Sequence, residues 1–380
     1  MEFFYCVSKH QITDLLYLRI ENKRMDSTKK IIIIGAGLTG LTLAYYLSKT
    51  KHSFKIIEAR KRIGGRIYTK VTNNSAPIEL GATWFAKQHT EALKLVKELN
   101  LGLFEQILGT TAIYEPISTS PAQIVQLPKN QEPSYRLKGG THQLINQLAS
   151  HINNDDLILN KEVSAIINEN DKVAVKTKTC THICDIVIST LPPHLLVNSI
   201  TFDPKLDNHT YQIAQNTHTW MGESIKIGFS YKTPFWRENN LSGTIFSNVG
   251  PIPEMYDHSN QQDNLYALKG FLNGVYYKVS KEERCELALR QLEKYYGKQA
   301  RYYVNYEEMV WKNKEYTSTE YGDLVLPHQK NGDAVFQNSY YNHKLWIAGT
   351  ETSTDYSGYM EGAIRSAQRV MNSIKKRPQN

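Results

Sequence analysis

Residues 31–40 have the sequence Ile-Ile-Ile-Ile-Gly-Ala-Gly-Leu-Thr-Gly, and this stretch decides the fold. Four β-branched residues followed by a glycine predict a buried strand that enters a tight turn, and residues 38–48 predict a helix that starts from the turn. In the dinucleotide fingerprint, the first glycine makes the turn, the second lets the backbone approach a pyrophosphate, and the third packs the helix on the strand. The helix N-terminus then faces the phosphates. The cofactor-binding residues predicted here are Gly35, Ala36, Gly37, Leu38, Thr39 and Gly40.

A second predicted strand, residues 54–58, ends in an acidic side chain. Glu58 follows Gly40 by 18 residues, close to the spacing at which a carboxylate accepts hydrogen bonds from both ribose hydroxyls. The same negative charge repels a 2′-phosphate, so NADP is not expected. A plain glycine turn without a ligand is the less favoured alternative.

The segment after this strand contains a second pair of glycines. Residues 58–66 have the sequence Glu-Ala-Arg-Lys-Arg-Ile-Gly-Gly-Arg. A simple NAD dehydrogenase needs no further glycines and arginine here. FAD is longer, and its pyrophosphate and ribityl chain need more backbone and guanidinium contacts. FAD is therefore the predicted cofactor, and further residues predicted to bind it are Arg60, Gly65 and Arg66.

Together with four further motifs, this segment resembles the flavin-containing amine oxidases, which include the monoamine and polyamine oxidases. The resemblance runs from about Lys29 to Ile374, with the motifs in the family's order. It implies that an amine gives a hydride from its α-carbon to flavin N5. The imine is then hydrolysed, and oxygen reoxidises the flavin to give hydrogen peroxide. The four motifs are residues 79–84 (ELGATW), 138–140 (KGG), 187–193 (VISTLPP) and 348–363 (AGTETSTDYSGYMEGA).

The C-terminal motif also has a physical explanation. A strand ends at Gly349, a loop follows, and a helix begins near Tyr359. The positive N-terminus of that helix stabilises the negative charge of a reduced flavin, whose ring lies here in the family. Val163, which aligns with a valine that meets adenine, is equally well explained as a core strand residue. The further cofactor-binding residues that the resemblance implies are Gly81, Ala82, Thr83, Trp84, Val163, Trp311, Gly349, Glu351, Tyr359 and Met360.

Three residues are candidates for catalysis. Residues 222–236 resemble the family segment whose lysine holds a water near flavin N5, which implies that role for Lys226. Without this match, a lysine within an alternating strand is simply a solvent-facing residue. The resemblance implies that Tyr321 and Tyr359 form an aromatic pair, and two facing rings would make a slot for an amine. In a chain with 24 tyrosines, each of them alone is also explained as a core residue.

The order of the elements predicts an α/β fold class: a Rossmann-type FAD-binding domain with an inserted, mostly antiparallel α+β substrate domain. The FAD-binding domain is expected to comprise residues 25–85, 136–200 and 335–376, and the substrate domain residues 86–135 and 201–334. Residues 109–132 carry several prolines and predict a loop or a short irregular strand. Residues 1–24 are expected to be an N-terminal extension of unknown role.

Composition and charge exclude several classes of partner. The chain has 380 residues, with 45 Lys and Arg spread along it against 37 Asp and Glu, so no nucleic-acid partner is expected. The uncharged stretch between Lys30 and Lys49 is broken by glycines after four apolar residues, so no membrane span is expected. The 12 histidines lack metal-ligand spacing, so no metal is expected. Four scattered cysteines fit a reducing compartment, and the cytoplasm is the expected location.

The sequence departs from the monoamine oxidases in two places. The stretch between Trp84 and Tyr135 is much shorter than theirs, so no substrate specificity is transferred. Where they carry a cysteine that bonds to the flavin, directly before the flavin-facing tyrosine, this chain has Glu320, so FAD is expected to be held non-covalently. The expected partners are a small amine and oxygen, with the kind of amine and the oligomeric state open. Two alternatives also stay open: an FAD oxidoreductase such as a desaturase acting on a non-amine, and a non-catalytic FAD-binding protein.

Overall fold

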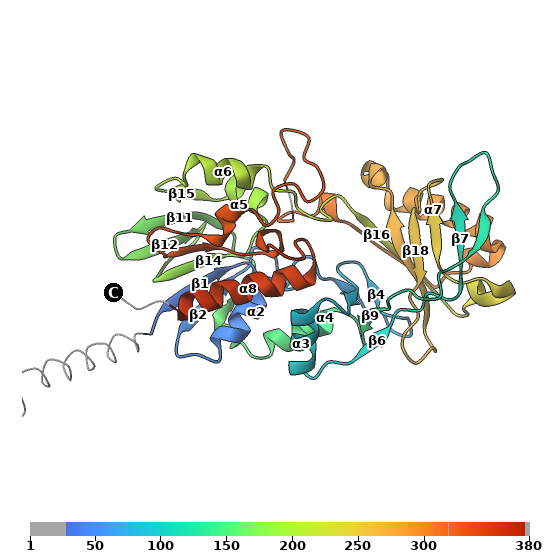
Figure 1. The fold of residues 1–380 in the computed structure, drawn as a ribbon, viewed down its shortest axis with the longest axis horizontal. Coiled ribbons are helices and arrows are strands. Elements are labelled where there is room, and N and C mark those ends of the chain that lie inside the picture. The colour runs from blue at the N-terminus through green and yellow to red at the C-terminus, as the bar shows by residue number, and fades with distance from the viewer. Residues whose placement is uncertain (1–27, 318, 377–380) are drawn as a thin grey trace, which may run out of the picture.

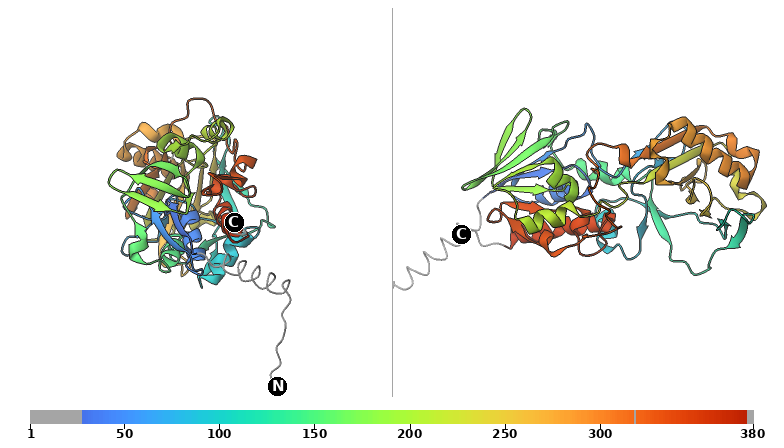
Figure 2. Two further views of the ribbon diagram at one scale, coloured as in Figure 1. Left: turned by 90° about the vertical axis from the view of Figure 1, so that its left-hand side faces the viewer. Right: turned by 90° about the horizontal axis from the view of Figure 1, so that it is seen from above.

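The computed structural model describes residues 28–317 and 319–376, which form two lobes along one long axis (Figure 1). The predicted N-terminal extension, residues 1–24, lies outside the described residues. The right-hand view of Figure 2, seen from above, shows the same two lobes end to end. Each lobe is built around its own β-sheet.

A six-stranded sheet forms the first lobe. Its strands follow the order β10-β2-β1-β14-β22-β21, and all neighbours pair in parallel except β21 and β22. Parallel pairing requires crossover connections, and here these bring together segments from both ends of the chain. The strands are β1 (Lys30–Ile34), β2 (Ser53–Ile57), β10 (Leu157–Ile158), β14 (Ile186–Ser189), β21 (Ser339–Tyr340) and β22 (Leu345–Ile347).

Both faces of this sheet are covered, which explains the unbroken apolar run in β1. Ile31 and Ile33 pack in one core with α2 (Leu38–Leu47) and α8 (Met360–Lys375). Ile32 and Ile34 pack on the opposite face, in a second core with a four-stranded sheet. That sheet has the order β13 (Thr181–Cys184), β12 (Lys172–Thr177), β11 (Val163–Glu169) and β15 (Thr201–Asp203).

A seven-stranded sheet forms the second lobe. Its neighbours pair antiparallel except β17 and β7, which are parallel. Ile225, Ile227 and Phe229 of one strand pack in a third core with α7 (Lys281–Tyr296), so the residues between them face the other side of the sheet. In sheet order the strands are β20 (Asn305–Val310), β16 (Ile225–Tyr231), β19 (Tyr266–Leu272), β18 (Glu254–Asp257), β17 (Ile245–Ser247), β7 (Thr111–Glu115) and β8 (Gln123–Gln126).

Short elements join the lobes and complete the chain. The remaining helices are α3 (Thr90–Glu98), α4 (His142–Ala149), α5 (Pro193–Ser199) and α6 (Asn208–Gln215). Two small sheets pair β3 (Thr69–Lys70) with β4 (Ile78–Glu79), and β9 (Ser134–Leu137) with β5 (Phe85–Ala86) and β6 (Leu103–Glu105). The 3₁₀ turns cover Asn154–Asp156, Phe235–Asn240, Gly274–Lys278, Lys298–Arg301, Trp311–Asn313, Ala334–Gln337 and Thr350–Thr352.

The α/β fold class predicted from the sequence is confirmed, and the structure resolves the two alternatives left open for residues 109–132. Residues 109–132, predicted as a loop or a short irregular strand, contain two short strands that form the hairpin of β7 and β8, and β7 also pairs with β17. That partner lies more than a hundred residues away, so the local proline content gave no sign of it. The strands of the six-stranded sheet all come from the segments expected to form the FAD-binding domain, and those of the seven-stranded sheet from the segments expected to form the substrate domain. The expected boundaries at 85/86 and 135/136 fall within β5 and β9. No helix in the described ranges is long and apolar enough to cross a membrane.

Candidate active site

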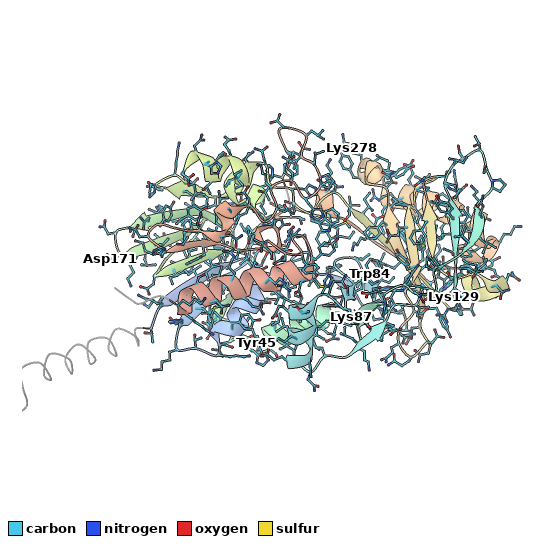
Figure 3. All side chains as sticks on the ribbon, in the orientation of Figure 1. Tyr45, Trp84, Lys87, Lys129, Asp171 and Lys278 are labelled. Carbon is cyan, nitrogen blue, oxygen red and sulfur yellow. The ribbon has the colours of Figure 1, made fainter. Side chains whose placement is uncertain are left out.

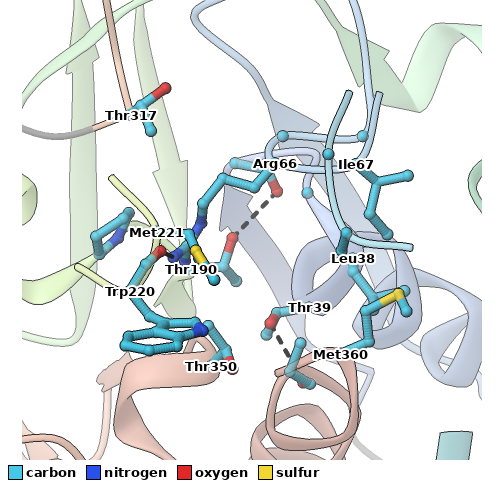
Figure 4. A pocket seen from close by; sticks show the side chains of 18 of the residues that line it. Leu38, Thr39, Arg66, Ile67, Thr190, Trp220, Met221, Thr317, Thr350 and Met360 are labelled. Atoms are coloured by element: carbon cyan, nitrogen blue, oxygen red, sulfur yellow. Dashed lines mark hydrogen bonds between the residues drawn. The ribbon is translucent and has the colours of Figure 1, made fainter. Parts of the chain in front are cut away.

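A cavity of about 560 Å³ runs between the glycine turn of the first lobe and the inner face of the seven-stranded sheet. In Figure 4, Arg66 and Trp220 lie on one side of it, and Leu38 and Met360 on the other. The structure therefore gathers into one space residues that lie far apart in the sequence. All the site residues predicted from the sequence line this cavity except Ala36, Gly40, Gly349, Glu351 and Tyr321.

The glycine turn has the geometry that its sequence predicts. Gly35 has a φ of 101°, in the left-handed region that favours glycine. A Cβ atom on Gly40 would lie 2.0 Å from the carbonyl oxygen of Gly35, so only glycine lets the helix approach the strand. The second glycine pair packs on this turn, since a Cβ atom on Gly65 would lie 3.2 Å from the Cα of Gly37. The result is a cavity wall made of bare backbone at the N-terminus of α2.

Glu58 follows β2 and lies on the cavity wall with its side chain buried. One carboxylate oxygen accepts a hydrogen bond from Ala36 N at 2.7 Å, and the other from Arg60 N at 2.9 Å. These bonds hold the carboxylate beside the glycine turn. Val163, which is also buried, lines the same end of the cavity. This end therefore combines an acceptor suited to ribose hydroxyls with an apolar wall suited to a base.

Two arginines of the predicted set make internal contacts. The Arg66 guanidinium donates to both carboxylate oxygens of the fully buried Glu351, at 2.6 and 3.0 Å. It also donates to the carbonyl oxygen of Trp220 at 3.0 Å. Arg60 reaches the loop after β20, where it donates to the hydroxyl of Thr317 at 2.7 Å. Glu351 does not line the cavity, but its carboxylate fixes the position of Arg66, which does.

The C-terminal motif brings the N-terminus of α8 to the cavity. Tyr359 is the N-cap residue, Met360 begins the helix, and both line the cavity. The Thr350 hydroxyl donates to the carbonyl oxygen of Tyr359 at 2.6 Å and so fixes the first turn. Trp311 lines the cavity near β16, and its indole nitrogen donates to the carbonyl oxygen of Leu80 at 2.8 Å.

Lys226 lies on the inner face of β16 and is buried, although a lysine in an alternating strand normally faces solvent. Its Nζ donates to the carbonyl oxygen of Gly81 and lies 4.9 Å from the centre of the Phe271 ring and 6.0 Å from that of Trp84. Burial lowers the pKa of Lys226 to about 8. An amine of this kind on a cavity wall can hold or release a proton near neutral pH.

The expected facing pair of Tyr321 and Tyr359 is not found. The Tyr321 ring lies 4.0 Å from that of His194 and 6.4 Å from that of His218, outside the cavity lining. The Tyr321 hydroxyl accepts a hydrogen bond from Thr219 N at 2.7 Å and lies 3.3 Å from the carbonyl oxygen of Thr217, and these contacts hold the ring away from the cavity. The sequence motif could not reveal these tertiary contacts.

The aromatic neighbours of Tyr359 are residues that the sequence motifs did not single out. Its ring lies 6.3 Å from that of Trp220 and 6.4 Å from that of His328, and the latter two rings stack at 4.0 Å. The ring centre of His89 also lies 5.9 Å from that of Tyr359. A single tryptophan or histidine carries no sequence signal of this kind. Trp84 lies at the junction of the lobes (Figure 3). Among the described residues, no group of three or more His, Cys, Asp and Glu could hold a metal ion.

Comparisons with known proteins agree with this geometry. A model of the flavin-containing amine oxidoreductases matches residues 117–374, and one of the NAD(P)-binding Rossmann-like domain matches residues 33–99. The flavin-containing amine oxidase A of Sus scrofa is 24% identical over 91% of this chain and 85% of its own length. A probable flavin-containing monoamine oxidase A of Dictyostelium discoideum is 31% identical over 63% of this chain and 53% of its own length.

Solved structures of low sequence identity share the fold. Putrescine oxidase bound to putrescine has a TM-score of 0.80 at 22% identity, and the match covers 92% of this chain and all of that one. Cyclohexylamine oxidase from Brevibacterium oxydans also has a TM-score of 0.80, at 20% identity over 92% of this chain and 99% of the other. Because the family model matches well over half of the residues, this chain belongs to the flavin-containing amine oxidoreductases, in agreement with the family and the FAD cofactor predicted from its sequence.

Proposed function

We propose that this protein is an FAD-dependent oxidase that takes a hydride from the α-carbon of an amine. The products are an imine, which water hydrolyses to an aldehyde and ammonia or a smaller amine, and hydrogen peroxide. One observation carries the proposal: a single cavity extends from the Glu58 carboxylate, past the glycine turn, to the buried amine of Lys226 and the ring of Tyr359. A ribose acceptor at one end and an amine at the other suit a long dinucleotide with a redox-active ring.

The residues of this cavity fit FAD. Glu58 would accept the ribose hydroxyls, and the backbone of Gly37 and Gly65 leaves room for the pyrophosphate. The positive N-terminus of α8, at Met360, would lie near the ring and favour its reduced form. When bound, FAD supplies the hydride acceptor and the reaction with oxygen. Lys226 would place a hydrogen-bonding, titratable amine beside the ring.

Oxygen uptake by the purified protein across a panel of primary, secondary and polyamine substrates tests this function. Amine-dependent uptake with stoichiometric peroxide supports it. A yellow protein whose flavin is bleached anaerobically by a non-amine, and by no amine, would instead indicate the desaturase-like alternative. A flavin that no substrate reduces would indicate a non-catalytic FAD-binding protein.

We expect Tyr359→Ala to lower amine turnover about tenfold and to leave FAD affinity within about twofold, since a cation held against an aromatic ring gains from roughly 0.5 kcal/mol at an exposed site to about 2 kcal/mol when it is desolvated. Tyr321→Ala, outside the lining, should lower turnover less. Steady-state kinetics and FAD titration of the two variants check this. A larger effect of Tyr321→Ala on turnover would mean that Tyr321, and not Tyr359, holds the amine.

FAD should be held by non-covalent contacts alone. Glu320 occupies the position directly before Tyr321, and a carboxylate cannot form a thioether to the flavin. Among the described cysteines, Cys285 lies in α7 behind the seven-stranded sheet, in the core that faces away from the cavity. Acid precipitation should therefore release the yellow colour into the supernatant. Colour that stays in the washed pellet, with a flavin-bearing peptide found by mass spectrometry, would contradict this expectation.

A further inference from the structure

A second lysine lies next to Lys226 on the inner face of the seven-stranded sheet. In the antiparallel register, Lys226 of β16 is opposite Phe271 of β19, and Lys269 is opposite Gly228. Cross-strand partners share a face, and so do residues two apart in a strand, so both lysines face the first lobe. Both Nζ atoms lie 4.9 Å from the centre of the Phe271 ring. The motifs of the sequence give no role to Lys269.

Lys269 is an unusual residue for a protein interior. Its side chain is 0% exposed, and its Nζ lies 3.7 Å above the Trp84 ring. Its one hydrogen-bond partner in the described structure is the hydroxyl of Thr83, at 3.2 Å. A buried ammonium with one neutral partner is strongly disfavoured, and burial together with the charge of Lys226 holds the pKa of Lys269 well below its usual value.

The charged and titratable groups around Lys269 do not remove this penalty. Glu79 of β4 is buried, its pKa is raised by burial, and its carboxylate is already bound to Thr69 and to Thr141 N. Glu254 of β18 attracts both lysines from the next strand. The positive charges of Arg136 in β9 and Lys226 in β16 lower the pKa of Lys269 further. Two uncharged neighbours complete its surroundings: Tyr256, opposite it in β18, and the buried His258, directly after β18.

The two lysines bind the same short loop of the other lobe. Lys226 donates to the carbonyl oxygen of Gly81, and Lys269 donates to the hydroxyl of Thr83. The Thr83 hydroxyl in turn donates to the Gly81 carbonyl oxygen at 3.1 Å. A chain of hydrogen bonds therefore runs from Lys269 through Thr83 and Gly81 to Lys226. Gly81, Thr83 and Lys226 all line the cavity, whereas Lys269 lies behind its wall.

We propose that Lys269 is a positioning residue, which acts through Thr83 and Gly81 to fix the amine of Lys226 on the cavity wall beside the flavin. This proposal rests on the proposed function, because it assigns Lys226 to the flavin. A donated hydrogen bond from Lys269 directs the single hydroxyl proton of Thr83 onto the Gly81 carbonyl oxygen. Because the Gly81 carbonyl oxygen is then held in one position, the hydrogen bond that Lys226 donates to it also holds the Lys226 amine in one position. On this proposal, burying Lys269 lowers the free energy of unfolding, while its hydrogen bond orders the active site.

The test follows the reaction of flavin with oxygen, which needs no amine substrate. The FAD-loaded enzyme is reduced with dithionite, mixed with oxygen, and its reoxidation is followed by absorbance. Lys269→Met should lower the rate of reoxidation about tenfold. Misplacing a reacting group by about an ångström can lower a rate by roughly a hundredfold, so a smaller shift of Lys226 is enough to explain this loss. Thr83→Val should do the same and Thr83→Ser should restore the rate. The Lys226→Met/Lys269→Met double variant should equal Lys226→Met alone, since residues that act through one another are not additive.

Thermal unfolding separates positioning from a structural role. Lys269→Met removes a buried, poorly paired amine, so its Tm should rise. Because the pKa of Lys269 is lower in the folded state than in the unfolded state, the wild type becomes more stable as the pH rises toward about 10.4, the pKa of an unfolded lysine. The difference in Tm between Lys269→Met and the wild type should therefore shrink as the pH rises. Lys278→Met, at an exposed lysine near the Tyr277 ring, is the matched control and should change neither rate nor pH dependence.

Each outcome decides for or against the proposal. A slower reoxidation with a raised Tm and no additivity supports it. Unchanged reoxidation in Lys269→Met, or rate losses that multiply in the double variant, would overturn it. If no amine reduces the wild-type flavin, the proposed function fails, and the dithionite experiment still tests whether Lys269 acts through Lys226.

Discussion

Lys226→Met is expected to keep its FAD and to lose about 100-fold in turnover, a typical contribution of a positioned proton-transfer group. The two side chains have similar length, so the change mainly removes the amine that lies buried on the cavity wall. A positive charge there would stabilise the negative charge that develops on oxygen during reoxidation. The loss should therefore appear in the oxidative half-reaction, in the reductive one, or in both.

The rate of flavin reoxidation should fall as the pH rises, because of the ionisation of Lys226. Because burial lowers the pKa of Lys226 to about 8, its charge disappears as the pH rises through that value. Reoxidation of the wild type by oxygen should slow over the same range, and the Met variant should lack this ionisation. Anaerobic stopped-flow reduction and subsequent mixing with oxygen measure both half-reactions. If both rates match the wild type, Lys226 is a strand residue with no part in the reaction.

Glu58→Ala should weaken FAD binding by about 5- to 150-fold, since unpaired buried groups cost roughly 1–3 kcal/mol. The change removes the proposed ribose acceptor and leaves the N–H groups of Ala36 and Arg60 without the carboxylate that they bind. Fluorescence titration of the apoprotein with FAD gives the Kd. The purified variant should also lose colour on dialysis.

Two variants control for general damage to the cavity. Glu58→Gln keeps one oxygen acceptor and should lose less affinity than the alanine variant. Glu162→Ala removes another acidic side chain from the same end of the cavity and should change the Kd by no more than about twofold. Equal affinity of wild type and Glu58→Ala would mean that the cofactor does not contact this carboxylate.

The sequence predicts best what is local. The strand, turn and helix of residues 31–47 are adjacent in the chain. Gly35 is favoured by its positive φ and Gly40 is required by its close approach to Gly35, so the local pattern alone predicts the turn. Lys226 was found only through its flanking motif, because strand alternation by itself predicts a solvent-facing lysine. For a lysine without such a motif, alternation would give the wrong answer: Lys269 is buried by Trp84, which comes from the other lobe.

Other features depend on contacts between distant segments. Tyr321 matches its motif, yet its hydroxyl contacts the backbone of residues 217–219 and its ring packs on His194. Trp220 lines the cavity because Gly358 leaves room for it: a Cβ atom on that glycine would lie 2.7 Å from the tryptophan side chain. Neither relation has a fixed spacing in the sequence, so only the folded chain shows it.

The ion pair between Arg66 and Glu351 has a consequence for biosynthesis. Its two partners are separated by 285 positions, and β22, which pairs with β14 in the middle of the sheet, is translated long after β1. A nascent chain that still lacks these residues leaves the edge of β14 unpaired and has no carboxylate to bind the Arg66 guanidinium. Because contacts of high sequence separation form slowly, we expect the first lobe to fold slowly. A chain truncated before β22 is therefore expected to leave the six-stranded sheet of the first lobe incomplete and Arg66 without Glu351.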